Sequence, residues 1–227
     1  MSLHRAVAAE GLGTLLLLAI VVGSGVMGER LADGNLAIAL LANAGATAAG
    51  LYVLIVLLAP ISGAHFNPAV TLALRLSGQR FAAPWPLYVV AQLTGAVLGV
   101  WLAHAMFALP LWQPGTHVRT GSAQALSEGV ATFGLLLTVL LGARFRPAAI
   151  PALVASWIFA AYWFTASTSF ANPAVTLARA LTRSFAGIRP LDAPGFIVAQ
   201  LLGAITALLV ARLLLPSVLP SEHDQPT

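Results

Sequence analysis

The chain has 227 residues, of which 59% are hydrophobic and 8% charged, whereas about a quarter of the residues in a soluble domain carry a charge. This composition predicts a polytopic membrane protein with room for about six spans of roughly 20 residues and no separate soluble domain. The absence of cysteine excludes disulfides, thiolate metal sites and cysteine nucleophiles. The net charge of +4 comes from 11 dispersed arginines without a basic block, so nucleic-acid binding is not indicated.

Three spans and one short helix are predicted in the first half of the chain. The first span is long enough to cross a bilayer, and Glu10 interrupts its apolar run, so it does not resemble a removable signal peptide. The second span is expected to stop at Pro60, which lacks the backbone donor that a helix needs. In chain order, the spans are 6–27, 36–58 and 86–108, with the short helix 67–76 before the last of them.

The second half repeats this order after an irregular link over residues 110–121. Its spans are predicted at 123–143, 148–164 and 193–215, with a short helix at 172–181 before the last span. We expect residues 1–220 to form a single transmembrane domain. Residues 221–227 are polar and are predicted to be a disordered tail.

The two halves share sequence as well as order. The heptapeptide Asn-Pro-Ala-Val-Thr-Leu-Ala begins at Asn67 and again at Asn172. The halves also share Glu-Gly-x-x-Thr, beginning at Glu10 and Glu128, and Val-Ala-Gln-Leu, containing Gln92 and Gln200. Residues 1–109 and 122–216 are therefore predicted to be two repeats. Because each holds three spans, the second repeat should be inverted in the membrane relative to the first.

Each heptapeptide is predicted to open a half-helix that enters from a loop and ends midway through the membrane. Asn can cap free N–H groups, and Pro suits the first helical position because its missing donor would be unpaired there. In an inverted repeat the two N-termini meet near the midplane, where their partial positive charges favour lone-pair oxygens and oppose cations. Non-helical backbone is tolerated at this depth only where it lines a wet cavity or is buried in protein, so a pore centred on Asn67 and Asn172 is predicted.

With two Asn-Pro-Ala motifs, the lead-in Ser62-Gly63-Ala64-His65-Phe66 and glutamates at the head of the first and fourth spans, the chain resembles the aquaporin, or major intrinsic protein, family. The resemblance covers nearly the whole chain. It implies an all-α membrane protein with six transmembrane helices and two re-entrant half-helices. It also implies a passive channel for small neutral solutes in the lipid bilayer, a homotetramer with one pore per subunit, and neither enzyme activity nor a cofactor.

The residues that would form the narrow filter depart from the usual pattern of this family. Val175 stands where most members have arginine after the second Asn-Pro-Ala, and Thr176 replaces the aspartate of glycerol facilitators. Spacing from the motifs places the other filter positions at Thr47, Ser169 and Ala160, which gives a small, uncharged and wide opening. Val175 with Thr47 resembles a bacterial subgroup associated with arsenic resistance. The expected solutes are therefore neutral metalloid hydroxides such as arsenous acid, and similar polyols, with some water.

Four further residues have two interpretations each. Arg179 lies one helical turn beyond Val175, so it either replaces the missing filter charge or caps the end of its half-helix. Intramembrane Glu10 and Glu128 suggest a proton site in general, whereas in this family they would accept hydrogen bonds from the re-entrant loops. His65 either lines the inner pore or packs in the core. The remaining histidines lack metal-ligand spacing, so no metal site is expected.

Orientation and the class of transport stay open at this point. With both termini on one side, that side holds six of the 11 arginines, so the positive-inside rule gives almost no direction. Cytoplasmic termini in the inner (plasma) membrane are implied only by the resemblance. The alternatives to a metalloid channel are an ordinary water or glycerol channel, a proton-coupled secondary transporter, and a membrane-embedded enzyme.

Overall fold

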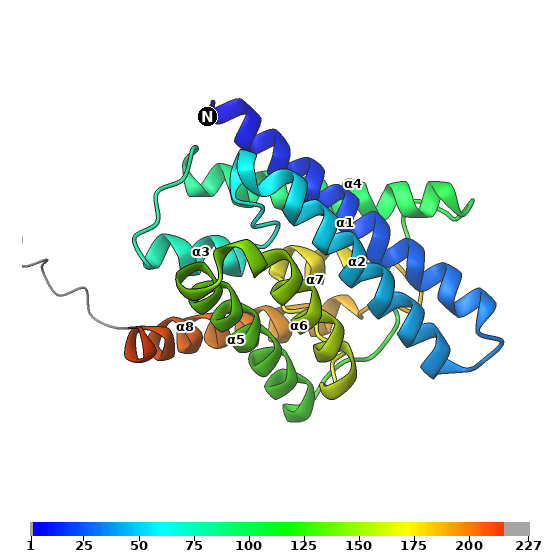
Figure 1. Cartoon of the computed structure of the whole chain (residues 1–227). Coiled ribbons are helices and arrows are strands. Elements are labelled where there is room, and N and C mark those ends of the chain that lie inside the picture. Colours follow the sequence, from blue (N-terminus) through cyan, green and yellow to red (C-terminus); the bar gives the residue numbers. More distant parts are fainter. Residues whose placement is uncertain (1, 216–227) are drawn as a thin grey trace, which may run out of the picture.

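The computed structural model describes residues 2–215, and over this range the chain forms helices and loops without a strand (Figure 1). Six helices are long and apolar enough to cross a membrane when the short 3-10 turns before two of them are included. The predicted fold of six spans and two shorter helices is therefore confirmed. The helices are α1 (Leu3–Leu31), α2 (Leu36–Ser62), α3 (Pro68–Leu76), α4 (Trp85–Met106), α5 (Ser122–Phe145), α6 (Ile150–Phe164), α7 (Pro173–Arg179) and α8 (Ala193–Leu214). The predicted tail 221–227 lies outside the described residues.

The prediction that the second span stops at Pro60 is wrong. Helix α2 continues to Ser62, because the missing N–H of Pro60 removes only one hydrogen bond near the end of the helix. Gly63 ends the helix instead. It adopts a left-handed conformation with φ of 95°, which glycine accepts without a steric penalty, and its N–H donates to the Ala59 carbonyl at 2.9 Å. The chain therefore leaves α2 directly into the first re-entrant loop.

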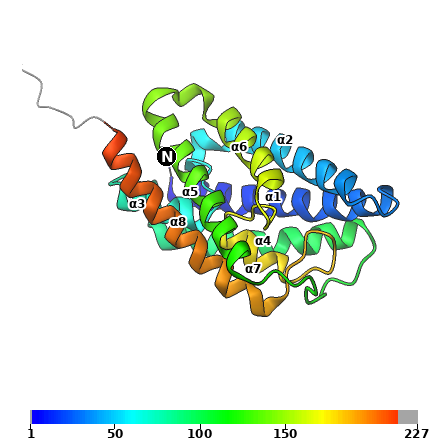
Figure 2. The ribbon, with the colours of Figure 1, turned by 90° about the horizontal axis from the view of Figure 1, so that it is seen from below.

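The two halves pack in the same way. Helix α1 lies against α2 and α4, and its counterpart α5 lies against α6 and α8. The halves are joined where α2 packs on α6 and where the half-helices α3 and α7 meet. Figures 1 and 2 show the first half, whose colours run from blue at α1 to green at α4, against the second half, whose colours run from green at α5 to red at the end of α8. The limits of the repeats, 1–109 and 122–216, stay a prediction.

Glycines allow the closest helix crossings, and these also occur in matching places. A methyl group at Gly95 of α4 would collide with the carbonyl oxygen of Gly11 in α1. A methyl group at Gly203 of α8 would collide with the carbonyl oxygen of Gly129 in α5. The backbones therefore approach as closely as small residues permit in membrane helix packing, and this approach holds each glutamate-bearing helix against its partner.

Candidate functional site

The N-termini of the two half-helices are hydrogen-bonded to each other's loops. In both Asn67 and Asn172, the side-chain oxygen accepts the backbone N–H two residues further on at 2.9 Å, which caps the half-helix. The side-chain nitrogen of Asn67 donates to the Ala171 carbonyl, and that of Asn172 donates to the Phe66 carbonyl, both at 2.8 Å. Each amide nitrogen carries two N–H groups, and only one is used in these bonds. The second is available at the cavity that both asparagines line.

The first re-entrant loop is held by Glu10, which is fully buried. One carboxylate oxygen accepts from the Ser62 hydroxyl at 2.6 Å and from the His65 N–H at 3.0 Å. The other accepts from the Phe66 N–H and from the side chain of Gln92, both at 2.8 Å. These four donors occupy the carboxylate, and Glu10 does not line the cavity.

Glu128 has the same position beneath the second re-entrant loop. Its carboxylate accepts from the N–H groups of Phe170 at 2.8 Å and Ala171 at 2.9 Å, and from the side chain of Gln200 at 2.6 Å. Gln200 also donates to the Thr176 hydroxyl at 2.8 Å, which ties α8 to the half-helix α7. Backbone donors that have no helical partner are thus paired at membrane depth, where an unpaired N–H is costly.

A cavity of about 180 Å³ runs between the halves and is lined at both half-helix termini. Its long walls are apolar, and half of the polar side chains that line it belong to the two re-entrant loops: His65, Asn67, Ser169 and Asn172. The wall residues recur at four-residue spacing on three helices: Thr47, Leu51 and Ile55 on α2, Leu135, Val139 and Ala143 on α5, and Ile150, Val154, Ile158 and Tyr162 on α6. A cavity with apolar walls and a few polar lining groups suits an uncharged solute that can form a few hydrogen bonds.

Three of the four predicted filter residues line this cavity, and the fourth does not. Thr47, Ser169 and Val175 are buried cavity-lining residues. Ala160 is exposed on the outer side of α6, so the prediction for this position is wrong. Two residues further on, a helix has turned by about 200°, and Tyr162 faces the cavity instead. Its hydroxyl donates to the Thr47 hydroxyl at 3.4 Å.

Arg179 also lines the cavity, with 1% of its surface exposed. Its guanidinium carbon lies 3.4 Å from the centroid of the Phe170 ring, and its Nε donates to the Ala186 carbonyl. Among the described residues, neither its Nη1 nor the hydroxyl of Ser169 has a hydrogen-bond partner. The guanidinium is therefore held against the wall by a cation–π contact.

His65 lines the cavity on the other side of the asparagine pair. Its Nδ1 lies 3.1 Å from the Thr71 hydroxyl of α3, and its ring contacts Phe81 at 4.9 Å and Tyr88 at 5.3 Å between centroids. Both of its interpretations thus apply, because the ring packs in an aromatic cluster and still borders the cavity.

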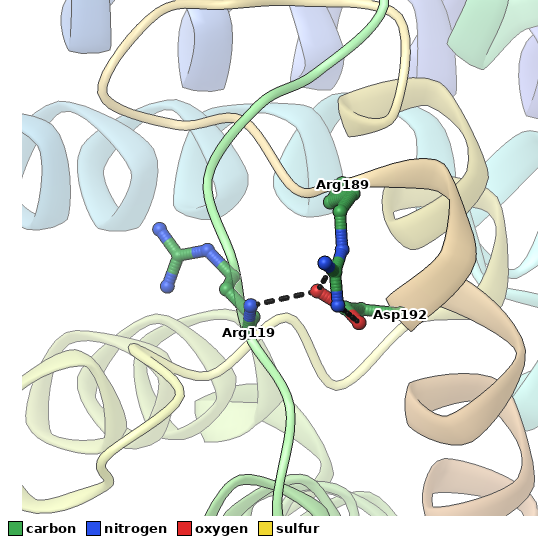
Figure 3. Close-up of polar contacts among 3 residues, drawn as sticks. All are labelled: Arg119, Arg189 and Asp192. Carbon is green, nitrogen blue, oxygen red and sulfur yellow. Dashed lines mark hydrogen bonds and ion pairs between the residues drawn. The ribbon is translucent and has the colours of Figure 1, made fainter.

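Arg119 supports the second loop from outside and was missed by sequence reasoning. Its backbone N–H donates to Asp192 at 2.8 Å, and the same carboxylate pairs with Arg189 at 2.7 Å (Figure 3). Figure 3 shows the Arg119 guanidinium directed away from this pair. It donates to the carbonyls of Gly187 at 2.9 Å and of Ser167 at 3.2 Å, and Ser167 lies two residues before Ser169. A lone arginine in an irregular link carries no periodic signal that could have indicated this.

The chain matches the family model described as Major intrinsic protein over residues 1–153 and 148–225. Aquaglyceroporin AqpS of Rhizobium meliloti (strain 1021) is 56% identical over 218 residues, which cover 96% of this chain and 93% of that protein. The Glycerol uptake facilitator protein of Bacillus subtilis (strain 168) is 31% identical over 55% of this chain and 52% of its own length. The X-ray structure of the aquaglyceroporin from Plasmodium falciparum has the same fold, with a TM-score of 0.70 at 19% identity over 92% of this chain and 95% of that one.

Proposed function

Since the chain belongs to the major intrinsic protein family, we propose that it conducts neutral metalloid hydroxides, such as undissociated arsenous acid, together with similar polyols and some water. Membership of this family makes the chain a multi-pass membrane channel for small uncharged solutes and not an enzyme. The proposal concerns which of those solutes pass. It rests on the residues at the filter.

The observation that carries the proposal is the position of Val175 and Arg179. Val175 presents only a short apolar side chain to the cavity beside the second half-helix N-terminus. The nearest guanidinium on the same half-helix belongs to Arg179, one turn further out, and it is stacked on Phe170. A flat cation on the wall narrows the passage less than one that extends across it. A neutral molecule with several hydroxyl groups is larger than water and would use the extra width.

We infer that Arg179 supplies the filter charge that Val175 lacks. Its side chain donates to the Ala186 carbonyl, beyond the half-helix, and no hydrogen bond links it to the carbonyls of α7 in the described structure. This favours a filter role over a helix cap. The Nη1 of Arg179 and the Ser169 hydroxyl are buried without a hydrogen-bond partner among the described residues, and the fixed positive charge beside the cavity opposes cations.

The runner-up is an ordinary water or glycerol channel, and the name of the 56% identical relative is compatible with it. A proton-coupled transporter is disfavoured because both buried carboxylates are occupied by loop and glutamine donors. A carboxylate that must exchange protons with a solute pathway would need to face the cavity, and neither Glu10 nor Glu128 does.

The test is stopped-flow and uptake measurement in proteoliposomes under gradients of water, glycerol and arsenous acid. We expect all three to enter faster than in protein-free vesicles, without dependence on a proton gradient. Val175→Arg is expected to reduce passage of glycerol and arsenous acid more than passage of water, because it adds a guanidinium at the narrow level. Uptake of arsenous acid no faster than in empty vesicles would overturn the proposal.

We also propose a homotetramer in the inner (plasma) membrane with cytoplasmic termini. The family resemblance supports the assembly. The distribution of arginines supports the orientation, because all six on the side of the termini are exposed, whereas three of the five on the other side, Arg119, Arg179 and Arg189, are partly or fully buried. Cross-linking of purified protein tests the assembly, and protease or label accessibility of the N-terminus in sealed vesicles tests the orientation.

A further inference from the structure

The two faces of the molecule differ strongly in exposed charge. The face that holds the N-terminus and the end of α8 (Figure 1) carries six exposed arginines: Arg5, Arg75, Arg80, Arg144, Arg146 and Arg212. Among residues 2–215, the carboxylates outside the buried pair Glu10 and Glu128 all lie on the opposite face: Glu29, Asp33 and Asp192. There they balance Arg30, Arg183 and Arg189. The face of the termini therefore attracts anions, and the opposite face is close to neutral.

A groove of about 560 Å³ opens on the basic face, between the end of α3 and the start of α4. Arg75 and Arg80 line it, and Trp85 closes it at the first turn of α4. A third arginine stands beside it, because Arg212 of α8 donates to the Leu76 carbonyl at 3.2 Å. Two arginines that line one concave site suit a phosphate-type anion, which arginine binds through several N–H groups.

The outer surface of α4 is apolar along the helix that leads away from this groove. Leu87, Val90, Leu98 and Leu102 are 40%, 58%, 43% and 40% exposed. At 100° per residue these four positions share one side of the helix. In a membrane this stripe contacts hydrocarbon. Trp85 lies about 160° around α4 from Leu87, so this stripe does not run into the groove; the apolar lining of the groove itself comes from Phe81, Pro84 and Trp85.

We propose that this groove binds the headgroup of an anionic phospholipid, with Arg75 and Arg80 on the phosphate and the start of the acyl chains against Phe81 and Trp85. A free phosphate ion would use only the arginines. A lipid uses both parts, and basic residues at the bilayer surface each strengthen attraction to anionic lipid. The site lies outside the cavity between the asparagines, so lipid binding does not depend on which solute the channel conducts.

The test is native mass spectrometry of the full-length protein released from detergent with phosphatidylglycerol or phosphatidylcholine. We expect phosphatidylglycerol adducts on the wild type and few phosphatidylcholine adducts. The double variant Arg75→Gln/Arg80→Gln is expected to weaken phosphatidylglycerol binding by about tenfold or more. The matched control Arg144→Gln/Arg146→Gln removes the same charge from the same face outside the groove and should bind lipid like the wild type. Arg75→Lys/Arg80→Lys should retain part of the binding, which separates loss of charge from misfolding.

Three results would overturn the proposal. Equal losses in both glutamine double variants would mean diffuse attraction to the whole face. Displacement of the lipid by millimolar inorganic phosphate would mean a site for a soluble anion. A change of oligomer mass in Arg75→Gln/Arg80→Gln, without a change in lipid adducts, would mean that a second copy of the chain covers the groove.

Discussion

Replacing Gly203 by alanine tests whether the close crossing of α8 on α5 holds the second re-entrant loop in place. A Cβ built at Gly203 would lie 3.1 Å from both the Gly129 carbonyl carbon and the Phe133 nitrogen, and closer still to the Gly129 oxygen. All three are backbone atoms, so no side chain can rotate away and the helices must separate. Overpacking costs about 1–3 kcal/mol, and alanine returns up to about 1 kcal/mol of helix propensity. Because the obstacle is backbone, we expect a net loss near the upper end, about 2 kcal/mol.

The same separation acts on the site. Gln200, one turn before Gly203, donates to Glu128 at 2.6 Å, and Glu128 directly precedes Gly129. Moving the helices apart stretches this bond and loosens the carboxylate that binds the loop ahead of Asn172. Solute uptake should therefore fall together with stability.

The assay is thermal unfolding of purified protein in detergent, followed by proteoliposome swelling. A loss of about 2 kcal/mol in a chain of this size corresponds to a fall in apparent Tm of about 4–8 °C. Gly195→Ala is the matched control, because it lies in the same helix and a Cβ there meets nothing within 4 Å. If Gly203→Ala melts and conducts like Gly195→Ala, the crossing does not support the loop and the reasoning is refuted.

Three further substitutions test the site itself. Arg179→Ala should raise cation conductance in planar bilayers, because it removes the fixed charge near Val175, and a conductance equal to that of the wild type would contradict its filter role. Glu128→Gln replaces a carboxylate that accepts three hydrogen bonds by an amide with one acceptor oxygen. We expect the free energy of unfolding to fall by about 1–3 kcal/mol, seen as a lower apparent Tm. Unchanged melting would disprove the supporting role that we assign to Glu128. Arg119→Gln should lower the ratio of glycerol to water permeability by loosening the loop before Ser169, whereas Arg189→Gln, exposed on the far side of Asp192, is the control that should leave this ratio unchanged.

The architecture could be predicted because three independent patterns agreed. Apolar runs of membrane length gave the six spans, Asn-Pro followed by few helical residues gave the two half-helices, and the repeated heptapeptide related the halves. The predicted end of the second span at Pro60 was wrong, because a proline near the last turn removes only one backbone hydrogen bond and the helix can continue past it. Helix α2 ends instead at Gly63, which has a left-handed conformation.

The site could be predicted where a residue is tied to a motif and not where its position depends on helix register. Asn67, Asn172, Ser169 and Val175 lie within a few residues of the motifs. The position on α6 had no such anchor, and an error of two residues placed Ala160 on the wrong side. The apolar spacing that leads through Ile158 to the next cavity position contained the correct register, which a periodicity count would have recovered.

Arg119 could not be predicted because its partners are backbone carbonyls distant in sequence. Ser167 is 48 residues away and Gly187 is 68, and neither is marked by residue type as an acceptor. Contacts of this kind depend on where an irregular link settles on the folded bundle, which composition does not specify.

The side-chain amides of Asn67 and Asn172 each donate a hydrogen bond to the loop of the opposite half, and this has a consequence for biosynthesis. The Phe66 carbonyl acquires its partner only when Asn172 has been translated and inserted, 106 residues later. Until then the first re-entrant loop has a buried acceptor without this donor, so an isolated N-terminal half should be a poor substrate for stable insertion. The centre of the pore is therefore complete only when both halves are present and have closed on each other.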